Sequence, residues 1–190
     1  GCAVGCPEGM LEGCVVGCPE GLPVGAPLGC DDGTVVGWGL NDYGQTDIPP
    51  GLNNVVAIAA GWYHSLALKT DGTVTTWGGS INYTPAGVNN MVAVSAGLYA
   101  MGLRHDGSVV VWDGAGVRSD TPANLEGVVA ISAGLLGTQL ALKSDGTVVA
   151  WGNNSYAQAT VPSGLSRVIA VAAGERHSLA LKSDGTVVAW

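Results

Sequence analysis

The chain contains 190 residues, 47% of them hydrophobic and 12% charged, with 31 glycines and no phenylalanine. Its 7 basic and 15 acidic residues give a net charge of −8, and the basic residues do not cluster. This balance argues against binding to nucleic acid or to an anionic membrane surface, both of which need basic patches. No apolar run approaches the roughly 20 residues of a membrane-spanning helix, so we also expect no membrane insertion.

The first 30 residues form a Cys/Gly-rich segment with a repeat of its own. Residues 1–9 and 13–21 share the pattern Gly-Cys-x-Val-Gly-Cys-Pro-Glu-Gly, 12 residues apart. All the cysteines of the chain lie in this segment: Cys2, Cys6, Cys14, Cys18 and Cys30. We therefore divide the chain into the Cys/Gly-rich segment, residues 1–30, and a repeat domain, residues 31–190.

Two chemical roles are open to these cysteines. Disulfides, within the segment or between chains, are the favoured interpretation over a metal site, because thiolate sites more often show two-residue spacing and no histidine lies nearby. The odd number leaves one cysteine that is free or pairs with another chain. Disulfides form in oxidising compartments, so we expect an extracellular or cell-surface protein.

From residue 32 the chain repeats a unit that ends in tryptophan. Trp38, Trp77, Trp112, Trp151 and Trp190 are spaced by 39, 35, 39 and 39 residues. In the clearest unit we predict strands over 55–61, 65–69 and 73–77, with an Asp-Gly hairpin turn at 71–72. A weaker fourth strand is expected near 83–84. The corresponding first strands begin near Val55, Met91, Val128 and Val168.

The strands are apolar on both faces, as in residues 148–151, Val-Val-Ala-Trp. A sheet with one solvent-exposed face would alternate apolar and polar residues along each strand. Each small sheet is therefore expected to lie between two neighbouring sheets. The first strands end in small residues, such as Ala59-Ala60-Gly61, which suit a point where wedge-shaped sheets converge. These features predict an all-β, β-propeller-type array of about four to five antiparallel blades. A parallel β-helix is the competing solenoid, but it does not need a hairpin turn in every repeat.

The repeat count leaves the closure of this array open. The first strand type occurs four times and the third type five times, beginning with a strand over 34–38, so the terminal strands duplicate each other. Three interpretations fit: a fragment of a longer propeller, an open arc completed by another copy of the chain, or closing strands from residues 1–30. Because unpaired edge strands recruit partners, we expect copies of the chain, as oligomers or filaments, among its protein partners.

The unit resembles the repeat of the regulator-of-chromosome-condensation propellers. Residues 61–78 and 174–190 share His-Ser-Leu-Ala-Leu-Lys-x-Asp-Gly-Thr-Val-x-x-Trp, which carries the resemblance. The connections 38–50 and 151–162 are similar to the short bacterial version of the repeat, which also occurs in a secreted propeller-fold β-lactamase inhibitor. The resemblance implies a bacterial extracellular propeller whose contact residues follow the repeated glycine or lie in the loops between strands.

Those positions carry the candidate partner-binding residues. After the repeated glycine stand Trp62 and Tyr63, then Tyr99, whereas the later units have aliphatic or charged residues there. Equivalent polar loops on one rim add three more tyrosines. The candidate set is Trp62, Tyr63, Tyr99, Tyr43, Tyr83 and Tyr156.

No residue pattern points to catalysis. His64 and His177 share a repeat position and are interpreted as scaffold residues, and we expect no cofactor and no metal. The sequence predicts a non-catalytic extracellular repeat protein that acts in self-assembly or protein–protein interaction, through unfinished blades and the N-terminal cysteines. The alternative is a secreted binder or enzyme inhibitor that uses its loop aromatics.

Overall fold

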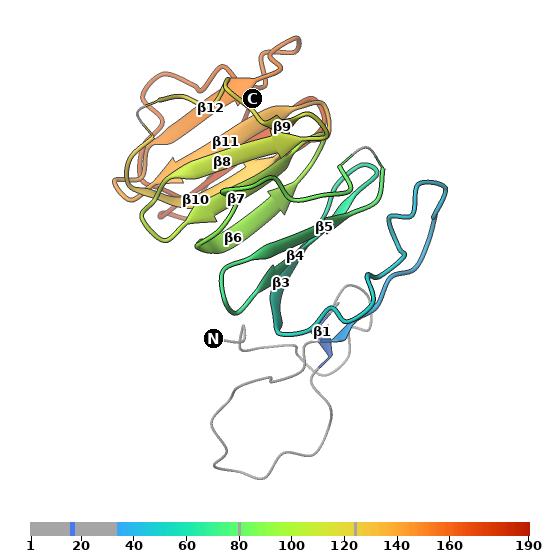
Figure 1. Cartoon of the computed structure of the whole chain (residues 1–190). Coiled ribbons are helices and arrows are strands. Elements are labelled where there is room, and N and C mark those ends of the chain that lie inside the picture. Colours follow the sequence, from blue (N-terminus) through green and yellow to red (C-terminus); the bar gives the residue numbers. More distant parts are fainter. Residues whose placement is uncertain (1–15, 18–33, 80, 124) are drawn as a thin grey trace.

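The computed structural model describes residues 16–17, 34–79, 81–123 and 125–190. The regular elements in these ranges are β-strands (Figure 1). No helix long and apolar enough to cross a membrane occurs in them. The five cysteines, and the predicted Cys/Gly-rich segment except for residues 16–17, lie outside the described residues.

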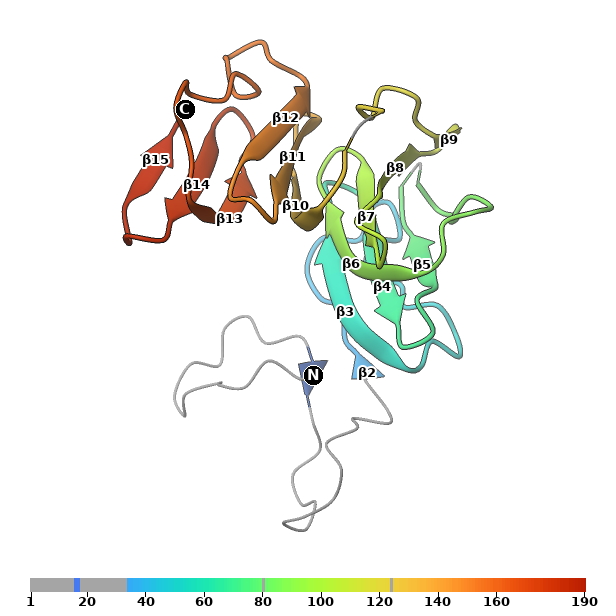
Figure 2. The ribbon, with the colours of Figure 1, turned by 90° about the vertical axis from the view of Figure 1, so that its left-hand side faces the viewer.

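Four antiparallel sheets follow one another along an arc, and we call them blades 1 to 4 (Figure 2). Blade 1 has β3 (Val55–Ala60), β4 (Ser65–Lys69) and β5 (Val74–Trp77); blade 2 has β6 (Met91–Ala96), β7 (Ala100–Arg104), β8 (Val109–Asp113) and β9 (Gly116–Val117); blade 3 has β10 (Val128–Ala133), β11 (Thr138–Lys143) and β12 (Val148–Gly152); blade 4 has β13 (Val168–Ala173), β14 (Ser178–Lys182) and β15 (Val187–Ala189). A further short strand, β1 (Val16–Gly17), pairs with β2 (Thr34–Val35). The first strands of all four blades begin at the predicted residues, which confirms the all-β, propeller-type array.

The predicted Asp-Gly hairpin turns are present in every blade. Gly72 has a positive φ of 76°, a conformation that costs glycine little. One carboxylate oxygen of Asp71 accepts hydrogen bonds from the backbone N–H and the hydroxyl of Thr73, at 2.9 and 2.6 Å. These hydrogen bonds lower the pKa of Asp71 below its ordinary value, because they favour the charged carboxylate. Equivalent bonds recur in the other three turns.

Two expectations about strands were wrong. The strand expected over 34–38 is only two residues long, and Trp38 beyond it is 67% exposed, whereas Trp112 is fully buried between blades. Residues 83–84 form no strand, because the hydroxyl of Thr84 donates to the carbonyl of Val74 at 2.8 Å and takes the place of a backbone ladder. In the described chain the fourth strand of a blade occurs instead as β9 in blade 2.

The first strands carry a feature that the sequence did not predict. In each of them the register with the second strand shifts after the first residue, so that one extra residue is left unpaired in a β-bulge. The bulge turns this extra residue towards solvent. The residues concerned are Val56, Val92, Val129 and Ile169, which are 55%, 50%, 55% and 58% exposed.

The hydrophobic cores lie between blades, as the two apolar faces predicted. Leu66 and Leu68 of blade 1 are 0% and 2% exposed, because they pack against the face of blade 2 that carries Ala100 and Trp112. Further clusters join blade 2 to blade 3 and blade 3 to blade 4. Burial of apolar surface therefore depends mainly on stacking successive repeats. A fourth cluster lies on the other face of blade 1, where Val55, Ala67 and Trp77 pack against side chains of the preceding segment.

The blades come closest where each first strand ends in the repeated glycine. The backbone N–H of Trp62 donates to the carbonyl of Gly97 at 3.0 Å, and that of Leu98 donates to the carbonyl of Gly134 at 3.1 Å. A Cβ atom on Gly61 would lie 2.8 Å from the Gly97 oxygen, and one on Gly97 would strike the Gly134 carbonyl. Only glycine lets two backbones approach this closely.

We expect Gly97→Ala to lower the free energy of unfolding by about 1–3 kcal/mol, as overpacking of a close contact does. Urea denaturation followed by circular dichroism measures the loss. Gly174→Ala is the matched control, since it has the same repeat position but its Cβ would meet the ring of the exposed His177, which can turn away. Equal losses in the two variants would show that the contact between blades is not the constraint.

Candidate functional site

One edge of the blades gathers all the variable connections. Because neighbouring strands are antiparallel, the connection after each first strand and the loop after each third strand leave from the same edge. Backbone hydrogen bonds join neighbouring segments of this edge. Gly79 N–H, after β5, donates to the carbonyl of Tyr43 in the loop after β2 at 2.9 Å, and Asn153 N–H, after β12, donates to the carbonyl of Gly137 in the connection after β10 at 3.1 Å. We call this edge the loop rim.

The loop that carries Tyr43 is held by its own side chains. Asn41 accepts from the backbone N–H of Thr46 at 2.9 Å, and the Gln45 side chain accepts from the backbone N–H of Tyr43 at 2.9 Å. The Gln45 carbonyl then accepts from Ser65 Oγ at 2.8 Å and from Trp77 Nε1 at 3.0 Å, which fastens the loop to blade 1. These bonds fix the backbone that presents the Tyr43 ring.

The loop that carries Tyr156 repeats this arrangement on blade 4. Gln158 is fully buried and its side chain accepts from the backbone N–H of Tyr156 at 2.8 Å. Its carbonyl accepts from Ser178 Oγ at 2.7 Å. Tyr43 and Tyr156 therefore stand at equivalent places on the rim, each on a loop pinned to the following blade.

Three of the predicted residues form one aromatic cluster on blade 1. The rings of Trp62 and Tyr63 stack with centroids 5.1 Å apart and planes 15° apart, and the Tyr43 ring lies 4.4 Å from the Tyr63 ring. Trp62, Tyr63 and Tyr43 are 48%, 36% and 54% exposed. We call these three residues the aromatic cluster. Sequence reasoning chose them for two different reasons, and the fold brings them together.

His64 follows Tyr63 in the chain and ends the connection that carries this cluster. Its side chain is 3% exposed, and the Gly61 N–H donates to its carbonyl at 2.8 Å. Burial lowers the pKa of His64 to about 4, since the charged imidazolium would lose its hydration. His64 is therefore a neutral packing group at neutral pH. His177, at the equivalent position of blade 4, is exposed.

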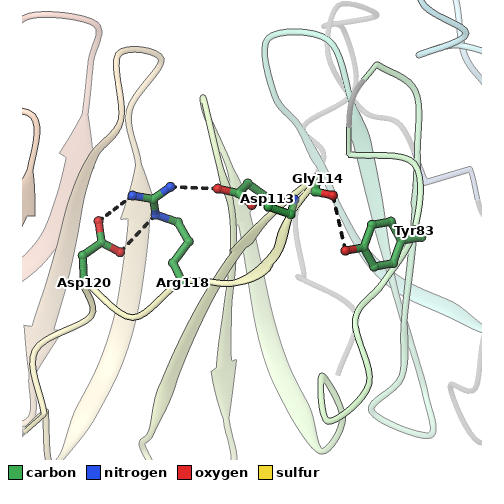
Figure 3. Close-up of polar contacts among 6 residues, drawn as sticks. Tyr83, Asp113, Gly114, Arg118 and Asp120 are labelled. Atoms are coloured by element: carbon green, nitrogen blue, oxygen red, sulfur yellow. Dashed lines mark hydrogen bonds and ion pairs between the residues drawn. The ribbon is translucent and has the colours of Figure 1, made fainter.

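Tyr99 of blade 2 is paired with a cation rather than with another ring. The guanidinium carbon of Arg118 lies 4.0 Å from the centroid of the Tyr99 ring. Figure 3 shows Arg118 held between two carboxylates, with 2.8 Å contacts to Asp113 and to Asp120. The hydrogen bond with Asp120 raises the pKa of Arg118 above its ordinary value and lowers that of Asp120. The guanidinium is thus fixed in charge and in position.

The two remaining tyrosines also lie on the rim but outside the aromatic cluster. Tyr83 is 43% exposed, and its hydroxyl donates a long 3.4 Å hydrogen bond to the Gly114 carbonyl of blade 2 (Figure 3). Tyr156 lies under Arg176, whose guanidinium carbon is 5.0 Å from the ring centroid. The six predicted residues therefore split into one cluster of three and three separate positions.

The two arginines are the rim residues whose role sequence reasoning missed. The sequence contains a signal that could have identified Arg176 as a rim residue, because Arg176 occupies the repeat position of Tyr63, two residues after the repeated glycine. No such signal exists for Arg118, since its loop after Trp112 has no counterpart in the other units. No three side chains of His, Cys, Asp or Glu gather as a metal site within the described ranges. What the rim offers chemically is aromatic faces, the guanidinium groups of Arg118 and Arg176, and exposed backbone.

A family model for the regulator of chromosome condensation (RCC1) repeat matches residues 55–83, 128–158 and 168–190. These stretches lie in blades 1, 3 and 4 and in the loops that follow them. A comparison with curated protein sequences found no match.

Solved structures share the fold at low sequence identity. The ectodomain of the receptor kinase CR4 from Physcomitrella patens matches with a TM-score of 0.66 and 23% identity, over 80% of this chain and 45% of that one. Yeast RCC1 (Prp20) bound to Kap60 matches with a TM-score of 0.58 and 21% identity, over 72% and 43%. The ectodomain of the Arabidopsis thaliana receptor kinase ACR4 matches with a TM-score of 0.58 and 23% identity, over 72% and 49%.

The chain therefore spans less than half the length of these propellers. At such identities the likeness establishes the fold alone. Together, the fold likeness and the repeat match confirm the resemblance to RCC1 repeats that the sequence predicted. The described chain is an array of RCC1-like repeats folded as propeller blades.

Proposed function

We propose that the chain is a non-catalytic protein-binding module whose partner docks on the loop rim. The observation that carries this proposal is the aromatic cluster, in which three large rings are held against one another and yet stay between 36% and 54% exposed. Tryptophan and tyrosine are enriched among the residues that dominate binding energy at protein interfaces. Rings that are already ordered lose little conformational freedom on binding.

Similar proteins support an interaction role. Yeast Prp20 has been crystallised with Kap60 and studied for its binding to Gsp1p and histones, and two plant relatives form receptor-kinase ectodomains. Prp20 is thus a propeller of similar fold that binds proteins, and CR4 and ACR4 carry a similar fold in an ectodomain, which supports both parts of the proposal. We therefore propose protein binding in an extracellular setting for this chain, in keeping with its cysteine-rich N-terminal sequence.

Protein binders selected by display against the chain test whether partners dock on the loop rim. We expect binders to lose most of their affinity for the triple variant Tyr43→Ser, Trp62→Ser, Tyr63→Ser, by more than about tenfold, as hot-spot residues do. The control is Val56→Ser, Val92→Ser, Val129→Ser, which removes three similarly exposed apolar side chains from the bulges. Binders that tolerate the cluster variant but not the bulge variant would overturn the proposal.

A second candidate function is association between copies of the chain, through the face of blade 4 that no described residue covers. Leu179, Leu181 and Val187 lie on this face, and Val187 is 62% exposed. The equivalent leucines of blades 1 and 3 are buried: Leu66, Leu68, Leu140 and Leu142 are 0%, 2%, 0% and 3% exposed. In each of those blades the covering surface is the opposite face of the next repeat.

The matching face of blade 1 is partly open. A hollow of about 270 Å³, mostly apolar, lies beside β3 and is lined by Trp38, Ile58 and Trp77 among others. The blade 4 face of one copy would therefore meet the blade 1 face of a second copy, as neighbouring blades meet inside the chain. Such a head-to-tail contact builds chains of copies unless the rotation closes a ring.

Analytical ultracentrifugation tests this second candidate, run with and without reductant so that disulfide links between chains are detected separately. We expect wild type to associate with rising concentration, and Val187→Glu and Trp38→Glu each to be monomeric, because a charge on either face opposes burial. Mixing the two variants should give a dimer, since each keeps one intact face. A wild-type chain that stays monomeric at all concentrations would contradict self-association.

A further inference from the structure

On the loop rim, arginine side chains stack on tyrosine rings of the same chain. Arg118 lies 4.0 Å over Tyr99 in blade 2, and Arg176 lies 5.0 Å from Tyr156 where the loop of blade 3 meets blade 4. Arginine is well suited to such stacking, because its planar guanidinium is weakly hydrated and always charged. Two tyrosines of the rim are thus already covered by a guanidinium from the same chain.

The aromatic cluster occupies the same repeat positions as one of these pairs. Tyr43 corresponds to Tyr156, since each stands five residues after its repeat tryptophan. Tyr63 corresponds to Arg176, since each stands two residues after the repeated glycine. Blade 1 therefore has tyrosine where blade 4 has arginine. Among the described residues no cation lies over the rings of Tyr43, Trp62 or Tyr63, whereas Tyr99 and Tyr156 each have one.

The charges around the cluster favour a positive partner. The loop over 38–47 that carries Tyr43 contains Asp42 and Asp47 and no lysine or arginine. Asp42 is exposed, and the Asp47 carboxylate is fixed by a 2.6 Å bond from the side chain of Asn41. The whole chain carries a net charge of −8. Such a field attracts basic segments and repels acidic ones, which sets partner choice more than affinity.

We propose that the aromatic cluster binds an arginine or lysine side chain presented by a protein partner. The inference rests on the proposed function and narrows it to a cationic contact. Trp62 offers the ring type that attracts cations most strongly, and it is 48% exposed. Tyr63 stacks on Trp62 and contacts Tyr43, so the three rings present one ordered surface rather than separate flexible groups. The loop over 38–47 beside them carries Asp42 and Asp47, whose negative charges attract the cation.

Three short peptides of equal length test the cation requirement: one with two arginines, one with citrulline at the same positions, and one with leucine there. Citrulline is nearly isosteric with arginine but carries no charge, because a carbonyl oxygen replaces one NH2 group of the guanidinium. Binding to the isotope-labelled chain is followed by NMR through the indole N–H of Trp62, assigned with Trp62→Phe. The buried indole of Trp112 reports any general change in the fold.

We expect the arginine peptide to shift the Trp62 indole signal at millimolar concentration, and the citrulline peptide to bind about fivefold more weakly, as a lost cation–π contact predicts. The variant Asp42→Asn, Asp47→Asn should weaken arginine binding but not change citrulline binding. Added salt should act in the same direction, since the charges are exposed.

The outcomes separate this inference from the proposed function. Equal binding of citrulline or leucine peptides at Trp62, or no shift with the arginine peptide, would overturn the cationic contact. If selected protein binders still depend on the aromatic cluster in that case, rim binding stands and only its chemistry is wrong. If the binders ignore the cluster, both proposals fail.

Discussion

The close approach of glycine backbones between blades is the constraint on which the rest of the molecule depends. At Gly97 the next blade leaves no room for a Cβ atom, and the following N–H donates across the boundary to the Gly134 carbonyl. This contact fixes the backbone of the connection that starts there. The residues after the glycine are then displayed on the loop rim whatever their side chains are.

Such a scaffold separates packing from recognition. In blades 1 to 3 the leucines of the second strands, together with Trp112 and Trp151, are buried between blades, so their identity is set by packing. The positions after the repeated glycine have no such restriction, and they carry aromatic residues in blade 1, leucines in blade 3 and a charged pair in blade 4. A fixed frame with variable rim residues is what a binding protein needs. The aromatic cluster and the arginine–tyrosine pairs are two versions of the same stacking chemistry.

The sequence predicted those parts of the structure that depend on local rules. Strand positions followed from the tryptophan spacing, and the turns followed from Asp-Gly, because glycine accepts the positive φ of 76° found at Gly72. The bulges at Val56 and its counterparts were missed, since they depend on the register between two strands. The stacking of Arg118 on Tyr99 was missed as well, because Arg118 stands in a loop without a repeat counterpart. Gathering Tyr43 with Trp62 and Tyr63 required the contact of two segments about 20 residues apart, which pattern alone does not supply.

Native-state amide hydrogen exchange at dilute concentration tests the glycine contact most directly. The amides of Trp62 and Leu98 donate to carbonyls of the next blade, whereas no blade among the described residues follows Glu175. If the contact holds the rim, Trp62 and Leu98 should be protected like amides of the central strands, and Glu175 should exchange rapidly. Exchange at Trp62 and Leu98 as fast as at Glu175 would contradict the account, because the rim would then move independently of the blades.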